Sequence, residues 1–142
     1  MEICVEILNS VRLLKEKMAE LECYIQALRM SAENLVPIMD GMPHASEVHS
    51  KVESISIKII DSERELSDLR EEVGEAKAGL MSRILNEVPD PVVQTLLALR
   101  YVECLSFRKV AARMHFSLRN VFRIHKNFLS KLSPYGELPE TR

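Results

Sequence analysis

Apolar residues in the first quarter of the chain recur at alternating steps of three and four residues. They are Cys4, Ile7, Val11, Leu14, Met18, Leu21, Ile25, Leu28, Ala32 and Leu35. An average step of 3.5 residues keeps one stripe of a helix facing a partner as the two helices supercoil, so the pattern is typical of a coiled-coil seam. It predicts a helix over residues 2–36.

A second series with the same alternation follows along the chain. Its members are Val48, Val52, Ile55, Ile59, Ser62, Leu66, Leu69, Val73, Ala76 and Leu80. Ser62 is the polar exception among them. The series predicts a second long helix over residues 47–87, which ends before Pro89-Asp90-Pro91.

Residues that break helices and favour turns lie between the two series. They are Pro37, Asp40, Gly41 and Pro43, so we expect a turn near residues 37–46. Because the two predicted helices have matched lengths, we favour an antiparallel coiled-coil hairpin within one chain, over residues 1–88. The same seam would serve equally well between two chains.

Some apolar residues fall outside the two seams. Ile57 and Ile60 lie off the second seam, and Ile3 and Leu8 flank the first. Burial of these side chains against a second copy of the chain would give a homodimer or a higher oligomer, which we expect. The alternative is that they are isolated aliphatic side chains on the surface, which soluble proteins commonly have.

A new helix is expected where the second long helix ends. Asp90 is a favourable N-cap and Pro91 suits the first helical position, and the apolar pattern continues to about Cys104. The end of the long helix offers apolar residues that we expect to pack on this new helix and those after it. They are Leu80, Met81, Ile84 and Leu85.

Two further short helices are predicted by their capping residues. Ser106 caps a helix that reaches Met114, and Ser117 caps another that reaches about Leu132. A tight turn over residues 114–117 would join them, which is the layout of a helix-turn-helix. We therefore expect a small domain over residues 80–132, which shares the end of the long helix, and a tail over residues 133–142.

The residue types within these two helices suit the crossed packing of a helix-turn-helix. Ala111 supplies a small residue where the helices touch, and His115 occupies a position in the turn that usually needs positive φ, which His tolerates better than most residues. The expected inward-facing residues are Val110, Met114, Phe116, Val121, Ile124, Phe128 and Leu132.

The net charge of −2 conceals a division of charge along the chain. Residues 1–90 carry ten basic and eighteen acidic residues, a net of −8, and residues 91–142 carry nine basic and three acidic residues, a net of +6. Cations gathered on a short helical segment are typical of a partner that is a polyanion, most often nucleic acid.

The face of the last helix opposite its apolar stripe has side chains that can read base edges in double-stranded DNA. With Ser117 at the start of the helix, these are Leu118, Arg119, Asn120, Phe122, Arg123, Lys126 and Asn127. Arg can bind guanine and Asn can bind adenine with two hydrogen bonds each in the major groove. Other basic residues are placed to contact phosphates, namely Arg100, Arg108, Lys109, Arg113 and Lys131.

The stretches Leu97-Ala98-Leu99-Arg100-Tyr101, residues 105–114 and Ser117-Leu118-Arg119-Asn120-Val121-Phe122-Arg123-Ile124 resemble region 4 of the sigma-70 family of RNA polymerase sigma factors. With the long helical segment in front, the chain is similar to small phage or prophage late transcription regulators of the ArpU-like and RinA-like types. The resemblance covers residues 80–132 and implies promoter DNA as a partner, with RNA polymerase as a second candidate partner. It also implies that residues 117–120, 122 and 123 lie at or beside the positions that approach promoter DNA.

The chain departs from the sigma pattern in two places. Arg108 and Lys109 are basic where sigma factors commonly carry acidic residues, and Leu118-Arg119-Asn120 stands where sigma factors commonly begin Arg-Glu-Arg. The usual promoter element therefore cannot be assumed. Nothing in the chain resembles the sigma segments that melt DNA and hold the polymerase core, so we do not expect an autonomous sigma factor.

Other classes of function have little support in the sequence. There is no phosphate-binding Gly-rich loop, and Glu63, Glu65, Asp68, Glu71 and Glu72 spread around a helix as a solvated face would, so we expect neither an enzyme nor a cofactor. The histidines His44, His49, His115 and His125 have no metal-binding spacing.

The cellular compartment is expected to be the cytoplasm. The chain has neither a signal peptide nor an apolar run long enough to span a membrane. Its three cysteines, Cys4, Cys23 and Cys104, are widely spaced and are expected to be reduced packing residues.

The sequence as a whole predicts an all-α DNA-binding transcription regulator, in which a hairpin precedes a helix-turn-helix. The rival hypothesis is a helical adapter that binds RNA polymerase or another protein without reading DNA. A preference for one duplex over a scrambled duplex separates the two hypotheses.

Overall fold

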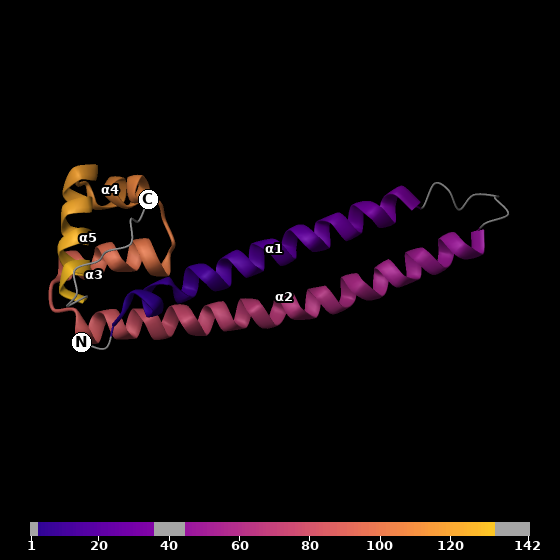
Figure 1. The fold of residues 1–142 in the computed structure, drawn as a ribbon, viewed down its shortest axis with the longest axis horizontal. Coiled ribbons are helices and arrows are strands. Elements are labelled where there is room, and N and C mark those ends of the chain that lie inside the picture. Colours follow the sequence, from indigo (N-terminus) through magenta and orange to yellow (C-terminus); the bar gives the residue numbers. More distant parts are fainter. Residues whose placement is uncertain (1–2, 36–44, 133–142) are drawn as a thin grey trace. The chain divides into compact units, whose positions relative to one another are not determined.

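The computed structural model describes residues 3–35 and 45–132 of the chain. These residues form α1 (Val5–Leu35), α2 (Ala45–Glu87), α3 (Pro91–Leu97), the π-helical segment η2 (Ala98–Val102), α4 (Phe107–Met114) and α5 (Leu118–Leu132) (Figure 1). No strand occurs in the described ranges, so the all-α prediction is confirmed for them. Pro37, Asp40, Gly41 and Pro43 of the predicted turn, and the predicted tail over residues 133–142, lie outside the described residues.

The chain divides into two compact units. One consists of Leu14–Glu72, and the other combines Met1–Leu13 with Val73–Arg142. The second unit therefore joins the beginning of the chain to all of the helices that follow α2.

Within Leu14–Glu72, parts of α1 and α2 run antiparallel in one chain. Glu22 pairs with Arg70 across 3.7 Å between Oε1 and the guanidinium, and Arg29 pairs with Glu63. As the residue number rises along α1, that of its partner falls along α2, which fixes both the direction and the register. Ile25 and Leu66 are buried between the helices, as is the seam residue Ser62.

The seam positions predicted for this unit are buried or half-buried wherever the structure describes them. The half-buried ones are Leu14, Met18, Leu21, Leu28, Ala32, Leu35, Val52, Ile55, Ile59 and Leu69. Among the charged residues that the structure describes in this unit, Lys15 is half-buried and the others are exposed, because only one stripe of a helix can face its partner.

The second unit is built around one cluster of buried apolar residues. It joins residues at the start of α1 and the end of α2 to residues of α3, η2, α4 and α5. The members are Ile3, Leu8, Val11, Leu80, Ile84, Val88, Leu96, Leu97, Tyr101, Val102, Phe107, Val110, Ala111, Val121, Phe128 and Leu129. The end of the long helix is thus part of the core on which the last helices pack.

Three expectations for this unit are wrong. Ile3 and Leu8 are fully buried in the chain's own core and are not available to a second molecule. Cys4 does not begin the seam, because it precedes the first residue of α1 and is exposed. Leu85 is 54% exposed, because the next residue along a helix from the buried Ile84 turns about 100° away from the core.

The cysteines are not all packing residues, as the sequence had suggested. All three are free thiols. Cys4 and Cys23 are exposed, and only Cys104 is partly buried, so the prediction holds for Cys104 and is wrong for the other two.

The junction between α2 and α3 is held by side-chain hydrogen bonds. The Asp90 carboxylate accepts a hydrogen bond from the Val92 amide at 3.0 Å, as expected of an N-cap. The side-chain amide of Gln94 donates to the backbone carbonyl of Val88 at 2.6 Å. This bond satisfies a carbonyl that has no helical partner because α2 ends there.

The helix predicted from Pro91 to about Cys104 is not a single α-helix. After Leu97 the backbone widens into η2, and the Glu103 amide donates to the carbonyl of Ala98, five residues back, at 3.0 Å. Cys104 then reverses the chain with a φ of 57°. The buried residues of this segment are Leu96, Leu97, Tyr101 and Val102, two pairs that lie five residues apart, and a π turn brings residues at that spacing onto one face.

Candidate nucleic-acid interface

The turn between α4 and α5 ends α4 with a left-handed residue. His115 has φ 58° and ψ 35°, which is the conformation predicted for this position. The Phe116 amide donates to the carbonyl of Ala111 at 3.0 Å, and the His115 amide donates to that of Ala112 at 3.3 Å. This pair of bonds is a Schellman motif, and it satisfies the last carbonyls of α4 while sending the chain towards α5.

Both helices begin at the serines that were predicted to cap them. The Ser106 hydroxyl accepts from the Lys109 amide at 3.4 Å, and the Ser117 hydroxyl accepts from the Asn120 amide at 3.1 Å. Each cap satisfies one amide of the first helical turn and so fixes where its helix starts.

The predicted inward-facing residues lie between α4, α5 and the rest of the core. Val110 and Val121 are fully buried, and Ala111 is buried where α4 meets α5. The remaining members are buried or half-buried, namely Met114, Phe116, Ile124, Phe128 and Leu132. This packing decides which face of α5 is left for solvent.

The outer face of α5 carries most of the residues that were predicted to read bases. Those exposed to solvent are Arg119, Phe122, Arg123, Lys126 and Asn127, with the exposed cap Ser117 at the start of the helix. Asn120 is half-buried, and its side-chain oxygen accepts a hydrogen bond from the Arg123 guanidinium at 2.8 Å. Leu118 is half-buried against the core and lies beside the outer face, not on it.

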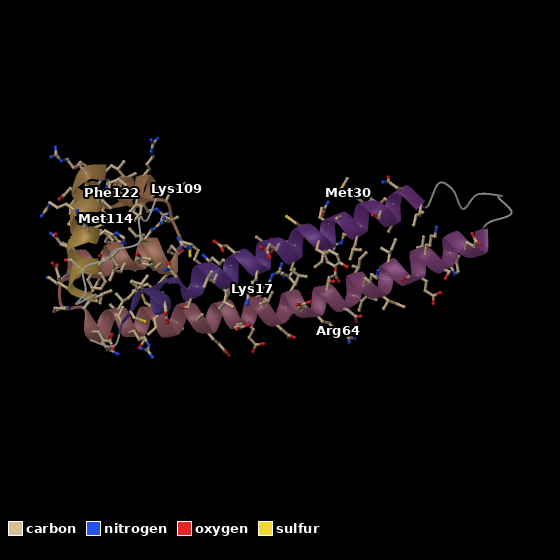
Figure 2. The ribbon with its side chains drawn as sticks, viewed as in Figure 1. Lys17, Met30, Arg64, Lys109, Met114 and Phe122 are labelled. Atoms are coloured by element: carbon tan, nitrogen blue, oxygen red, sulfur yellow. The ribbon has the colours of Figure 1, made fainter. Side chains whose placement is uncertain are left out.

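Exposed basic side chains lie on α4 as well as on α5. Arg108, Lys109 and Arg113 are exposed on α4, and Lys131 is exposed near the end of α5. Figure 2 shows Lys109 on α4 and Phe122 on the neighbouring α5. Residues 106–132 contain seven Lys or Arg residues and no Asp or Glu, so no acidic side chain in the two helices offsets the positive charge.

Arg100 is bound within the module. Its guanidinium donates to the carbonyl of Leu105 at 3.0 Å and lies 4.1 Å from the centre of the Phe107 ring, a cation–π contact. Partial burial is the main reason that the pKa of Arg100 is lowered from its usual value. The structure therefore gives this predicted phosphate-binding residue a packing role and places it apart from the exposed cations of α4 and α5.

A buried aromatic cluster supports α5 from beneath. His125 is 3% exposed, and its Nε2 lies 2.5 Å from the Tyr101 hydroxyl. The ring of His125 meets that of Phe107 edge to face at 4.9 Å, and Phe107 in turn meets the exposed Phe122 at 4.9 Å. Burial, followed by the charge of Arg100, lowers the pKa of His125 to about 4, so the ring is neutral at pH 7.

The burial of His125 has a signal in the sequence that the predictions above did not use. His125 lies four residues after Val121 and three before Phe128, at the spacing of the buried stripe of α5. The Tyr101 hydroxyl, its hydrogen-bond partner, is 24 residues away in the chain. The sequence therefore gave no reason to expect a hydrogen-bond partner for a buried His125.

A groove of about 320 Å³ lies between the start of α3 and α5. Arg123, Asn127 and Lys131 line it on the α5 side, and Val92 and Val93 line it on the α3 side. The charged residues that line the groove are Arg123 and Lys131 of α5 and Asp90, which caps α3.

Neither a metal centre nor a membrane span is found in the part of the chain that the structure describes. No three His, Cys, Asp or Glu side chains there are grouped so as to hold a metal ion. No helix there combines the length and apolar character needed to cross a bilayer.

In comparisons with known proteins, no protein-family model, no curated protein sequence and no solved structure matches this chain.

Proposed function

We propose that this protein is a sequence-specific DNA-binding transcription regulator, encoded by a phage or prophage, that reads promoter DNA with α5. The observation that carries the proposal is the exposed basic outer face of α5, which lies opposite a buried apolar face and begins at a defined turn. A rigid helix that presents Arg and Asn side chains suits the major groove, which is wide enough to admit an α-helix.

The base-reading role falls on the exposed side chains of α5. Arg123 and Arg119 are suited to guanine, and Asn127 is suited to adenine. The hydrogen bond from Arg123 to Asn120 restrains the guanidinium before DNA arrives, so less side-chain entropy is lost on binding. Phe122 offers an apolar surface for a thymine methyl group.

The phosphate contacts fall on Arg108, Lys109 and Arg113 of α4 and on Lys131 near the end of α5. Four such contacts would give a slope of about −4 for the logarithm of the binding constant against the logarithm of salt concentration. In this proposal Arg100 acts on DNA indirectly, because it holds Phe107, on which Phe122 rests.

The charge of the hairpin favours DNA binding by the C-terminal helices alone. Residues 1–90 carry a net charge of −8, which disfavours contact with phosphates. The resemblance to sigma region 4 adds RNA polymerase as a candidate partner of the same module.

The test is selection of bound fragments from genomic DNA, followed by binding measurements on one selected duplex and on the same bases scrambled. At physiological salt we expect the selected duplex to bind at least 10³-fold more tightly. Equal affinity for both duplexes would contradict the proposal. It would favour the helical adapter, which a pull-down of RNA polymerase then tests directly.

A further inference from the structure

Ile57 and Ile60 form an apolar patch on α2 that lies outside the seam with α1. Their side chains are 55% and 52% exposed. The residues between and beside them that face α1, such as Ile55 and Ile59, are half-buried in the seam. Within the described part of Leu14–Glu72, nothing covers this apolar patch.

Side chains of opposite charge lie at equal distances on either side of the apolar patch. Glu53 lies four residues before Ile57, and Arg64 lies four residues after Ile60. Both charged side chains are exposed, and Figure 2 shows Arg64 pointing away from α1. Steps of three and four residues place all four side chains on one face of α2.

A second pair of residues repeats the mirror arrangement further out. His49 lies four residues before Glu53, and Asp68 lies four residues after Arg64. Both are exposed. From its centre outwards, the face therefore carries an Ile–Ile pair, a Glu–Arg pair and a His–Asp pair. The two members of each pair lie at equal distances from the centre.

We propose that this face of α2 is the interface of a homodimer, in which α2 of one copy packs antiparallel on α2 of a second copy. The two-fold axis passes between Ile57 and Ile60, so that Ile57 of each copy meets Ile60 of the other. Glu53 of each copy then faces Arg64 of the other, and each interaction occurs twice, as a two-fold interface requires.

The pattern of charge selects both the partner and its direction. A parallel pairing would set Glu53 against Glu53 and Arg64 against Arg64, and facing like charges destabilise an interface. Glu53 and Arg64 are eleven residues apart, about 16 Å along the helix, so they cannot pair within one chain. Neither forms an ion pair with another described residue.

The experiment is sedimentation equilibrium of the full chain at low salt, and it does not depend on DNA binding. We expect the wild type to have twice the mass of the 16.2 kDa chain at micromolar concentration. Arg64→Glu and Glu53→Arg should each weaken the dimer about tenfold, because each sets two like-charged pairs across the axis. The double variant Glu53→Arg/Arg64→Glu restores opposite charges and should return the affinity to within about threefold of wild type.

Matched variants on α1 serve as controls. Glu20→Arg reverses an exposed charge on the same unit, and Tyr24→Gln/Met30→Gln removes two exposed apolar side chains there. Both should leave the dimer unchanged, whereas Ile57→Gln/Ile60→Gln should dissociate it, with the helical circular dichroism retained throughout.

Three outcomes would overturn the proposal. A wild-type monomer would exclude the dimer, and a dimer insensitive to the Ile57 and Ile60 changes would exclude this face. A double charge variant no tighter than the single variants would exclude the antiparallel register.

Discussion

At the scale of single residues, His125 is a buried neutral base. Its pKa is about 4 in the folded chain, against 6.5 for an ordinary histidine. As pH falls below about 6.5 the unfolded chain binds the proton first, so protonation favours unfolding. As pH falls from 6.5 to 4, this residue therefore lowers the stability of the folded chain. Below pH 4 its contribution does not change further.

We predict that this one residue removes on the order of 3 kcal/mol of stability between pH 7 and pH 4. The change to test is His125→Gln, because Gln can still accept a hydrogen bond from the Tyr101 hydroxyl but does not titrate near these pH values. Denaturant unfolding of both proteins across this range isolates the effect, since other titrating groups are common to both. An identical loss of stability in the two proteins would show that His125 is already charged or solvated in the folded state.

Arg123 and Lys109 should differ in what they contribute to DNA binding. We predict that Arg123→Ala weakens binding to the selected duplex about 10- to 100-fold with little effect on scrambled duplex, because Arg123 reads a base in the proposed function. Lys109→Ala should weaken both alike and reduce the salt slope by about one, because Lys109 contacts phosphate in the proposed function. Fluorescence anisotropy at several salt concentrations measures both effects, and equal losses on both duplexes for both variants would contradict the assignment.

The exposed basic residues could be predicted from the sequence, and Arg100 and His125 could not. Arg119, Arg123 and Lys126 fall opposite an apolar stripe of period 3.6, so their exposure follows from local periodicity alone. The surroundings of His125 are made by Tyr101 and Phe107, which the fold brings together from other helices. A single sequence does not reveal which distant residue will supply a partner.

At the scale of elements, the turn between α4 and α5 carries a residue in a conformation that suits glycine better. We predict that His115→Gly stabilises the chain by about 0.5 to 1 kcal/mol, since a φ of 58° is strained for a side chain with a Cβ. His115→Val should destabilise it, because a β-branched residue is least tolerant of positive φ. Thermal melting at pH 7 checks both changes.

A glycine substitution within a neighbouring helix is the matched control for this prediction. Ala112 is exposed in the last turn of α4, and Ala112→Gly should cost up to about 1 kcal/mol. A loss of stability in His115→Gly as large as that in Ala112→Gly would show that the imidazole ring makes contacts that outweigh the backbone strain.

The long helices and their seams could be predicted because one periodic pattern extends over many turns. The π turn of η2 could not, because its hydrogen bonds differ from those of an α-helix by one residue, and the paired spacing of Leu96 and Tyr101 also fits the two sides of an α-helix. The bounds of α4 and α5 were predictable from Ser106 and Ser117, whose capping is a strictly local interaction.

At the scale of the whole molecule, three residues near the start of the chain, Ile3, Leu8 and Val11, belong to the buried core on which α4 and α5 pack. We predict that deleting residues 1–13 destabilises α4 and α5, although these helices lie about a hundred residues later in the chain. Ile3, Leu8 and Val11 are buried, and the loss of each removes about 1.5 to 3 kcal/mol from a total stability of about 5 to 15 kcal/mol. Hydrogen exchange of the α5 amides, together with thermal melting, measures the effect.

Point variants separate the lost burial from the shortening of α1. Leu8→Ala should accelerate exchange in α5, whereas Arg12→Ala, at an exposed position of the same segment, should not. Unchanged exchange in both the deletion and Leu8→Ala would show that the last helices are stable without the beginning of the chain. A fragment that starts at Val92 lacks Leu80, Ile84 and Val88 as well, and we expect it to fold poorly.

The ion pairs of the hairpin, Glu22 with Arg70 and Arg29 with Glu63, are spaced by seven residues along each helix. In a coiled coil, positions seven residues apart along a helix are equivalent. Removing seven residues from both α1 and α2 therefore joins equivalent positions. Removing seven residues from one helix alone leaves seven residues of the other helix without a partner. Gene copies that diverge from this one are therefore constrained to gain or lose hairpin length by paired insertions or deletions. Length differences among descendants of this gene should thus occur in steps of fourteen codons.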